Sequence, residues 1–272
     1  MSPRLLLVDA LNLIRRVYAG QPGEEGAEKA VSARASSARS LLRALRQCAP
    51  THALCVFDGD GSSWRHEIFP EYKQGHAPMP APLAETLDSY RLTFGDMGVA
   101  SLVKPQLEAD DVVATIATKA ANSASVTILS TDKIFLSLLP IGVRVRDHFK
   151  GEYLDARYVQ KRFGVRPDQL TDFLALAGDR GNNITVFPES ARRPLESCWR
   201  HSSRWIECWR RQAISTESSA NDYASTQRLR AGVECWSRFS PIYVPAQMVA
   251  TQASLLHFLL FLTYTDCLES AI

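Results

Sequence analysis

The stretch Leu5-Leu6-Leu7-Val8-Asp9 is an apolar run that ends in an acid, and the fold prediction starts from it. Four consecutive apolar residues predict a short strand that is buried on both faces, as strands of a parallel sheet are. Apolar runs at 53–57, 100–103 and 126–129 predict three more such strands, separated by segments of helical period. From residue 4 to about residue 177, this alternation predicts an α/β fold with a mostly parallel sheet flanked by helices.

The helical segments are recognised by apolar residues that repeat every three or four positions. The alanine-rich stretch from Glu28 to Cys48 is the clearest one, and Val31, Leu41, Leu42 and Leu45 are expected on its buried side. Further helices are expected to begin near Pro82 and Glu108 and to span 157–163 and 168–177. The stretch from Trp64 to Pro80 is crowded with Pro and Gly, so no regular element is predicted there.

Composition limits the classes of function. The 272 residues are 46% hydrophobic and carry a formal net charge of +2, which predicts one or two domains and no pervasive basic field. Any contact with nucleic acid must therefore be local. The six cysteines form no CxxC pattern, which argues against a zinc site or a disulfide framework and favours a reducing cytoplasm.

No membrane segment is expected. The apolar start is interrupted by Asp9 and lacks a cleavage pattern, so it does not predict a signal peptide. The apolar run from Leu255 to Leu262 is much shorter than the roughly 20 residues that a membrane-spanning helix needs.

Acidic residues follow three of the predicted strands and open one predicted helix. In an open parallel sheet, the carboxyl ends of the strands form one crevice where ligands bind. A single acid in such a position is more often a helix cap than a ligand. Here the acids exceed what capping needs, and they would repel one another in a partly buried site. They are Asp9, Asp58, Glu108, Asp110, Asp111 and Asp132.

Divalent cations would remove this repulsion. Oxygen ligands without a supporting histidine or cysteine favour Mg²⁺, or Mn²⁺ in its place, over zinc. Two such ions about 4 Å apart activate a water and stabilise the leaving oxygen of a phosphodiester. The acids therefore predict metal-dependent hydrolysis of a phosphate ester.

A second interpretation stays open. Asp58-Gly59-Asp60 together with the segment 178–182 would suit a haloacid-dehalogenase-like phosphatase, with Asp58 as nucleophile and Asp60 as acid and base. This interpretation gives no role to Asp9 or to the acids at 108–111, and it places the first phosphatase motif on the second strand.

Two cations stand in the segment before Pro80. Arg65 is able to bind a phosphate through two hydrogen bonds, and Lys73 is able to place a point charge on one. An isolated Lys or Arg is more often an ordinary exposed cation, and Lys133 is able simply to pair with Asp132.

These residues resemble the motifs of the 5′–3′ exonuclease and flap endonuclease family, most closely its bacterial Xni type, over about residues 3 to 184. The order and spacing of the motifs are highly specific. They are Leu7-Val8-Asp9-Ala10-Leu11-Asn12-Leu13-Ile14-Arg15-Arg16, Val56-Phe57-Asp58, Trp64-Arg65-His66, Pro70-Glu71-Tyr72-Lys73, Glu108-Ala109-Asp110-Asp111, Ser130-Thr131-Asp132-Lys133 and Leu176-Ala177-Gly178-Asp179.

The resemblance implies a PIN-like nuclease domain, followed by a helix–hairpin–helix element that binds duplex DNA around a K⁺ ion. It implies that the tighter metal is held by the acids at 9, 58, 108, 110 and 111, with Asp110 the most important. Asp132 and Asp179 would face the second metal, and Leu176 and Ala177 would offer carbonyls to K⁺. Arg65, Tyr72 and Lys73 would contact DNA, with Asp9, Asp58, Arg65 and Lys73 taking part in catalysis.

The chain departs from the family pattern at three positions. Ile134 and Asn182 stand where relatives often carry an Asp, so the second metal is expected to bind weakly. His76 stands where the family usually has an arginine, so one phosphate contact is expected to depend on pH.

The amino-acid composition of the sequence changes after Ile184. All seven lysines precede residue 162, whereas four of the five tryptophans follow residue 197. Family codons for a glycine-rich hairpin, read in a shifted frame, give the sequence Val-Phe-Pro-Glu-Ser-Ala-Arg-Arg found at 186–193. We therefore expect a PIN-like 5′-nuclease domain at 1–184 and an aberrant, frameshifted tail at 185–272 that replaces the helix–hairpin–helix region and weakens duplex binding.

Three functions remain as hypotheses. The first is a Mg²⁺-dependent 5′-flap endonuclease that acts as a monomer on branched DNA or single-stranded 5′ ends in replication or repair. The second is the phosphatase. The third is a catalytically dead, DNA-binding remnant, since the tail is altered.

Overall fold

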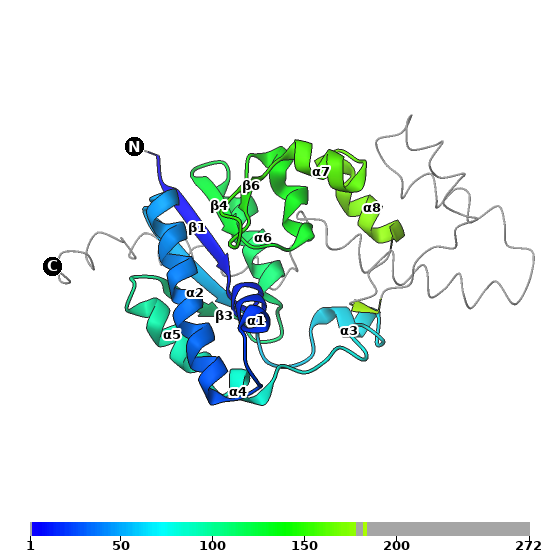
Figure 1. Cartoon of the computed structure of the whole chain (residues 1–272). Coiled ribbons are helices and arrows are strands. Elements are labelled where there is room, and N and C mark those ends of the chain that lie inside the picture. Colours follow the sequence, from blue (N-terminus) through cyan, green and yellow to red (C-terminus); the bar gives the residue numbers. More distant parts are fainter. Residues whose placement is uncertain (1, 178–181, 184–272) are drawn as a thin grey trace, which may run out of the picture.

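The computed structural model describes residues 2–177, 182 and 183, and its centre is a six-stranded sheet (Figure 1). The strand order is β3-β2-β1-β4-β5-β6; neighbours from β3 to β5 are parallel, and β6 is antiparallel to β5. The α/β prediction is confirmed. The strands are β1 (Arg4–Asp9), β2 (His52–Phe57), β3 (Ala100–Val103), β4 (Ser125–Leu129), β5 (Arg144–Arg146) and β6 (Tyr153–Leu154).

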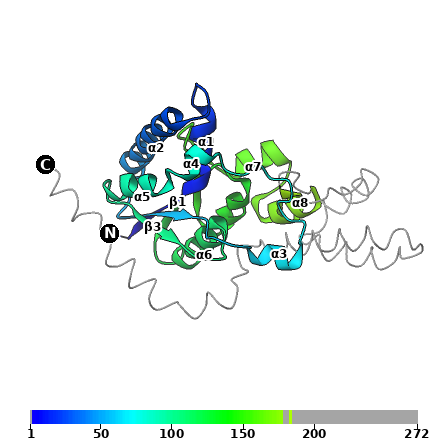
Figure 2. The same cartoon turned by 90° about the horizontal axis from the view of Figure 1, so that it is seen from below.

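Helices cover both faces of the sheet. Figure 2 shows α1, α2 and α5 on one side of the strands and α6 on the other. The helices are α1 (Ala10–Gly20), α2 (Ala27–Cys48), α3 (Trp64–Ile68), α4 (Ala81–Ala84), α5 (Leu87–Gly95), α6 (Ala109–Ala120), α7 (Ala156–Phe163) and α8 (Leu170–Ala177), with the 3₁₀ helices η1 (Lys133–Ile141) and η2 (Pro167–Gln169).

The two layers follow from the alternation of side chains along each strand. In β1, Leu5 and Leu7 belong to the hydrophobic cluster that includes α6 and η1, whereas Leu6 and Val8 belong to the cluster that includes α1 and α2. All four are buried, because both faces of the strand are covered. This explains why β1 is a continuous apolar run.

The prediction for α2 was right in extent and for the buried Leu41 and Leu45, but wrong for Val31 and Leu42. Val31 is 55% exposed and Leu42 is 37% exposed. The buried face instead consists mainly of small residues such as Ala30, Ala33 and Ser37, together with Leu41. Small side chains let α2 lie close to α1, and apolar size alone was therefore a poor guide.

Two further expectations are corrected. The expected single helix near Pro82 is two short ones, α4 and α5. The segment from Trp64 to Pro80 does contain a regular element, the five-residue helix α3. Helix α1 was not expected, although its buried residues Leu13, Ile14 and Val17 follow helical spacing and Asp9 accepts a hydrogen bond at its N-cap position.

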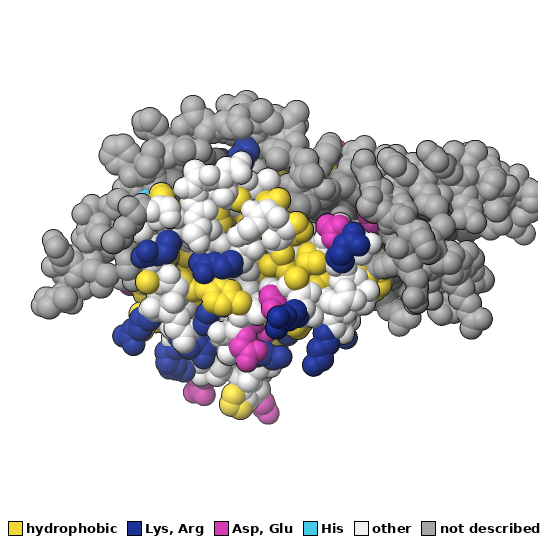
Figure 3. Space-filling view, turned by 90° about the horizontal axis from the view of Figure 1, so that it is seen from above, with side chains coloured by type: hydrophobic (Ala, Val, Ile, Leu, Met, Phe, Trp, Pro, Cys, Tyr) yellow, Lys and Arg dark blue, Asp and Glu magenta, His cyan; other side chains and the backbone are white. Residues whose placement is uncertain are grey.

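Charge is distributed unevenly over the molecule. On the face that Figure 3 shows, at the amino ends of the strands, Lys and Arg side chains are more numerous than Asp and Glu. The acids at the carboxyl ends are therefore a local cluster and not part of a uniformly acidic surface. Within the described part of the chain, no helix is both long and apolar enough to cross a membrane.

Candidate active site

Six acidic side chains lie around the carboxyl edge of the sheet. The register places Asp9 level with Val56 of β2, and Val8 level with Leu129 of β4. The chain therefore leaves these three strands at a similar level, and the loops that follow carry the acids. The six are Asp9, Asp58, Glu108, Asp110, Asp111 and Asp132.

A glycine brings the loop after β2 against the loop that leads into α6. A Cβ atom at Gly59 would lie 1.9 Å from the backbone oxygen of Lys104, so only glycine allows this approach. The backbone N–H of Gly59 donates to the carbonyl of Leu107 at 2.9 Å. As a result, Asp58 reaches the start of α6, where its Oδ1 accepts a hydrogen bond from the N–H of Ala109 at 2.7 Å.

Asp111 is neutralised by a buried arginine. The two terminal nitrogens of Arg65 donate to the two carboxylate oxygens of Asp111 at 2.6 and 2.7 Å. The indole N–H of Trp64 donates to the same carboxylate at 3.1 Å. Arg65 is 0% exposed. A charge removed from water to this extent needs such a bidentate partner.

Glu108 is also surrounded by donors. Its Oε1 accepts from the hydroxyl of Ser63 at 3.1 Å, and its Oε2 accepts from Tyr72 at 3.1 Å and from Nζ of Lys73 at 2.9 Å. Nη1 of Arg65 lies 3.6 Å from the same Oε2. We call Glu108, Asp111 and these donors the paired half of the cluster.

The electrostatics of the paired half favour the charged forms. Burial alone would raise the pKa of Glu108, but the charges of Arg65 and Lys73 outweigh it and lower that pKa. Burial would lower the pKa of Arg65, but Asp110, Asp111 and Glu108 together raise it. Opposite charges that are matched in this way hold each other in place.

Asp9 belongs to a different environment. Its Oδ2 accepts from the hydroxyl of Ser130 at 3.0 Å and its Oδ1 from the N–H of Asn12 at 3.2 Å. Among the described residues, no ion pair is formed by Asp9. Burial and then the charge of Asp132 raise the pKa of Asp9 to about 7.

Asp110 is perturbed in the same direction. Burial raises the pKa of Asp110 well above its usual range; Arg65 opposes this, while Glu108, Asp111 and Asp132 add to it. Asp132 therefore acts on both Asp9 and Asp110. We call Asp9, Asp58, Asp110 and Asp132 the open half of the cluster, because burial and neighbouring acids raise the pKa of Asp9 and Asp110, and Asp58 and Asp132 are among those acids.

The chemistry of the open half fits hard divalent cations. In the described residues, no three or more Asp, Glu, His or Cys side chains converge at direct metal-ligand distance. Mg²⁺ usually binds through one or two carboxylates and keeps several waters, so it does not need such convergence. Carboxylates whose pKa is raised by burial and by each other are stabilised by a positive ion, and the donor set is oxygen only.

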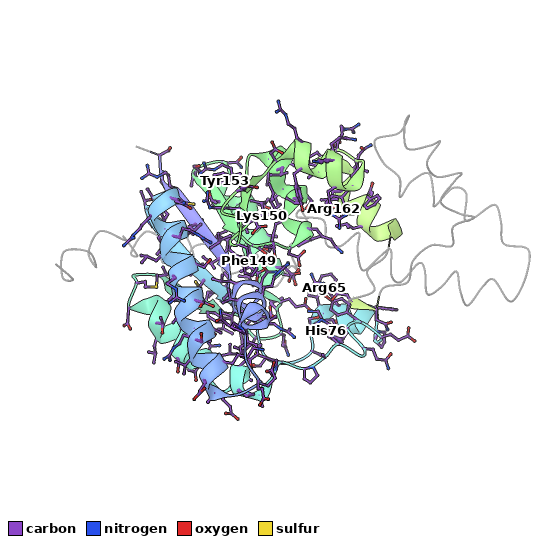
Figure 4. All side chains as sticks on the ribbon, in the orientation of Figure 1. Arg65, His76, Phe149, Lys150, Tyr153 and Arg162 are labelled. Atoms are coloured by element: carbon purple, nitrogen blue, oxygen red, sulfur yellow. The ribbon has the colours of Figure 1, made fainter. Side chains whose placement is uncertain are left out.

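The residues expected to contact DNA lie in different situations. Arg65, expected to bind a phosphate, is buried against Asp111 and does not face solvent. The side chain of Lys73 is 31% exposed and is therefore accessible while it pairs with Glu108. Tyr72 is buried with its hydroxyl on Glu108. Figure 4 shows Arg65 and His76 together on the segment around α3.

The end of the predicted domain is described only in part. Helix α8 ends at Ala177, so the backbone of Leu176 and Ala177 is helical there. The N–H of Lys73 donates to the carbonyl of Asn182 at 3.0 Å, which ties residues 182 and 183 to the segment before Pro80. Residues 178–181 of the phosphatase segment 178–182, Asp179 among them, and the tail from residue 184 on lie outside the described residues.

Sequence reasoning missed several polar partners. Ser63, Trp64 and Ser130 donate to the acids; Trp64 and Ser130 stand inside the quoted motifs, but the motifs did not show which acid each side chain contacts. Asn12 and His148, which contact each other at 3.3 Å beside the Asp132 loop, were also missed. Their spacing of 136 residues leaves no local pattern to recognise.

Comparison with known proteins gives consistent matches. A family model described as the 5′-3′ exonuclease N-terminal resolvase-like domain matches residues 4–164. A protein named flap endonuclease Xni from Aeromonas hydrophila is 43% identical over 189 residues, which cover 68% of this chain and 71% of that protein. The protein of the same name from Vibrio campbellii is 41% identical and covers 69% of this chain and 72% of its own length.

A solved structure agrees with the fold. A crystal structure of a bacteriophage T5 D15 flap endonuclease variant, in a pseudo-enzyme-product complex with DNA and metal ions, has a TM-score of 0.63. The match covers 98% of each chain at 20% identity. At this identity the likeness supports the fold alone, which is the PIN-like α/β fold expected from the sequence.

Proposed function

Because this chain belongs to the 5′-3′ exonuclease family and is a nuclease, we propose that it is a Mg²⁺-dependent 5′-flap endonuclease that hydrolyses phosphodiester bonds of branched DNA. The observation that carries this proposal is the open half of the acidic cluster. The charged forms of buried carboxylates that raise each other's pKa repel one another, and bound divalent cations would reduce this repulsion.

We assign the metal ligands by the same criterion. Asp9, Asp58, Asp110 and Asp132 would hold two divalent ions, with Asp179 beside them as the family motif implies; Mn²⁺ would substitute for Mg²⁺. Bound ions of this kind supply an activated water and stabilise the leaving oxygen. For Glu108 and Asp111, also expected as ligands, we favour a positioning role, because Lys73 and Arg65 already form ion pairs with these two carboxylates.

The cations of the paired half have separate tasks in this proposal. Lys73 is accessible and would contact the scissile phosphate, while its bond to Glu108 keeps Nζ near the open half. Arg65 would act through Asp111, by fixing the first turn of α6 that carries Asp110. Tyr72 would orient Glu108. This assignment replaces the direct phosphate contact that the sequence suggested for Arg65.

The substrate and the setting of the proposed activity come from the relatives. The T5 D15 structure contains DNA and metal ions, and the curated relatives are named flap endonucleases. We propose that the chain acts as a monomer in replication or repair in the cytoplasm, where the free thiols of Cys48 and Cys55 would persist. A K⁺ ion would bind the carbonyls of Leu176 and Ala177 in a chain with an intact hairpin.

Family membership decides against the phosphatase, but a disabled nuclease remains a distinct hypothesis. The altered sequence after residue 184 lacks the glycines that let a hairpin approach phosphates closely. We therefore propose that this chain binds duplex DNA weakly and that its second metal site is weak.

Cleavage of an end-labelled 5′-flap duplex across a Mg²⁺ titration tests the proposal. The full chain is compared with Asp110→Asn and with a version whose hairpin frame is restored. Cleavage by the full chain that disappears with Asp110→Asn supports a functional enzyme. Cleavage only after frame restoration supports the disabled form. No cleavage by either version contradicts the proposed chemistry, as does cleavage that survives Asp110→Asn.

A further inference from the structure

We infer that Asn12 and His148 are positioning residues that hold the Asp132 loop against Asp9, and so set the spacing of the open half. The inference rests on the proposed function, because it assigns these residues to the metal site described there. It starts from a chain of hydrogen bonds that joins α1, the loop after β4 and the hairpin between β5 and β6.

The backbone of the Asp132 loop is held mainly by side chains. The N–H of Ser130 donates to the carbonyl of Arg146, but the next two N–H groups have side-chain acceptors. The N–H of Thr131 donates to Oδ1 of Asn12 at 3.1 Å, and that of Asp132 donates to Oγ of Ser130 at 3.0 Å. The position of Asp132 therefore depends on where the amide of Asn12 lies.

Asn12 is bound to both sides of the open half. Its own N–H donates to Asp9, while its Oδ1 accepts from the N–H and the hydroxyl of Thr131. Because a backbone N–H is always a donor, the atom that faces it must be the amide oxygen. This fixes the orientation of the amide, and Nε2 of His148 at 3.3 Å must then carry the proton that it shares with Oδ1.

His148 is suited to act as a fixed donor. It is 2% exposed, and its Nδ1 has no hydrogen-bond partner among the described residues. Burial lowers the pKa of His148 to about 4; Asp147 opposes this shift, while Arg16 and Arg43 add to it. The ring is thus neutral at ordinary pH. Its backbone carbonyl accepts from Ser40 and Arg43 of α2, which anchors the hairpin at this point.

The network is covered by Phe149 and Arg16. The guanidinium of Arg16 lies 5.7 Å from the centre of the Phe149 ring, and its Nη1 donates to the hydroxyl of Thr131 at 2.7 Å. The ring of Phe149 also contacts that of His148, with 4.3 Å between centroids. Figure 4 shows Phe149 beside α1. This cover limits the access of water to the bond between His148 and Asn12.

Loss of the hydrogen bond that His148 donates should loosen the Asp132 loop without removing a metal ligand. Residues that orient metal ligands typically contribute about 10- to 100-fold in metal affinity or activity. We therefore expect His148→Leu to weaken binding at the weaker of the two metal sites by about 10-fold or more, and to lower kcat while KM for DNA stays near the wild-type value.

The test is calorimetric titration of the full chain with Mn²⁺, together with flap cleavage and the melting temperature. The variants are His148→Leu, His148→Gln and Asn12→Ala. Glutamine retains an N–H donor at similar reach and should restore most of the affinity. The losses of Mn²⁺ affinity in His148→Leu and in Asn12→Ala should not add when both changes are combined in one chain, because the two residues act as a unit. His52→Leu is the matched control, because His52 lies at the amino end of β2, away from the acids.

The outcomes separate this inference from the proposed function. The inference is overturned if His148→Leu binds Mn²⁺ as tightly as the wild type, or if His148→Gln does not restore the affinity that His148→Leu loses. Either result leaves the proposed function intact. If His148→Leu does not fold, the glutamine and Asn12→Ala variants decide by the same criterion. If the wild-type chain binds Mn²⁺ but the flap stays intact even with the hairpin frame restored, the proposed function is contradicted, while the comparison of Mn²⁺ affinities still tests the network. Wild-type chain that binds no Mn²⁺ contradicts both.

Discussion

The acidic cluster has two halves that differ in what balances their charge. In the paired half, Glu108 and Asp111 meet Arg65 and Lys73, and the pKa of Glu108 is lowered. In the open half, the pKa values of Asp9 and Asp110 are raised by burial and by neighbouring acids. Both halves come from the same edge of the sheet. The difference teaches that acids at neighbouring strand ends differ in how their charge is balanced, and our proposal places the metal ions where burial and neighbouring acids raise the pKa values.

The largest expected effect is on the stability of the paired half. Arg65→Leu would leave Asp111 buried without its partner, which should lower the free energy of unfolding by about 3–5 kcal/mol. Arg166 also makes a bidentate contact with Asp168, but on the surface, so Arg166→Leu should lower the free energy of unfolding much less than Arg65→Leu does. Urea unfolding of both variants measures the difference. Equal losses would mean that the burial of the pair has no consequence.

The next effect concerns chemistry in the open half. Asp110→Asn should lower the rate of flap cleavage by more than about 100-fold. Residues that orient metal ligands contribute about 10- to 100-fold, and the loss of a ligand itself should cost more. The stability of the metal-free chain should hold or rise, because a repelled charge is removed. Asp88→Asn, on the exposed side of α5, is the control and should cleave like the wild type. The distinction between the halves fails if Asp110→Asn cleaves at the control rate.

A pH-dependent effect of intermediate size is expected at Asp9. Its pKa rises from 3.8 to about 7 on folding, so the native state binds the proton more tightly than the unfolded state. The stability of the metal-free chain should therefore fall as pH rises from about 4 to about 7. Asp9→Asn should remove this loss and be more stable than the wild type by about 2 kcal/mol at pH 8, after allowance for relaxation around the site.

Thermal unfolding at pH 4, 6 and 8 without metal measures this advantage. It should be smallest at pH 4, where Asp9 is protonated in the native state. Asparagine keeps an oxygen for the N–H of Asn12, so the cap of α1 is preserved. If Asp9→Asn is more stable than the wild type by the same amount at all three pH values, the charge of Asp9 is not destabilised by its surroundings.

The smallest effect is expected at Lys73, which links the two halves. Lys73→Gln should reduce flap cleavage about tenfold, because glutamine keeps a hydrogen-bond donor but loses the charge that would contact the scissile phosphate. It should lower the free energy of unfolding by about 1 kcal/mol, since the bond to Glu108 is partly exposed. Lys29→Gln, which removes an i,i+4 pair with Glu25, is the control for losing a lysine. A loss of cleavage in both variants would point to a general effect of charge.

The sequence predicted the sheet well because each strand is a local apolar run. The strands near Leu5, Ala53 and Val126 and the helix after Glu108 all appear where expected. The short strands β5 and β6 were not foreseen, since they are three and two residues long and contain no apolar run that would mark a strand. On α2, Leu41 and Leu45 are buried as predicted, but Val31 and Leu42 are exposed, because much of the buried face consists of small residues such as Ala30 and Ala33.

For the site, the sequence identified which acids gather but not how they are divided. The positions of Asp9 and Asp110 were evident from strand ends and motif spacing. The burial of Arg65 was not, because an arginine beside a tryptophan looks the same whether it faces solvent or a carboxylate. The roles of Asn12 and His148 depend on contacts across 136 residues, which only the folded chain reveals.

Calorimetric titration with Mg²⁺ of the full chain, the Asp110→Asn variant and the Asp88→Asn control tests the central claim most directly. If the open half holds the ions, the wild type and Asp88→Asn bind Mg²⁺ with equal affinity, whereas Asp110→Asn binds it at least about 100-fold more weakly. Equal Mg²⁺ binding by Asp110→Asn and the wild type would contradict the assignment of the metal site to the open half.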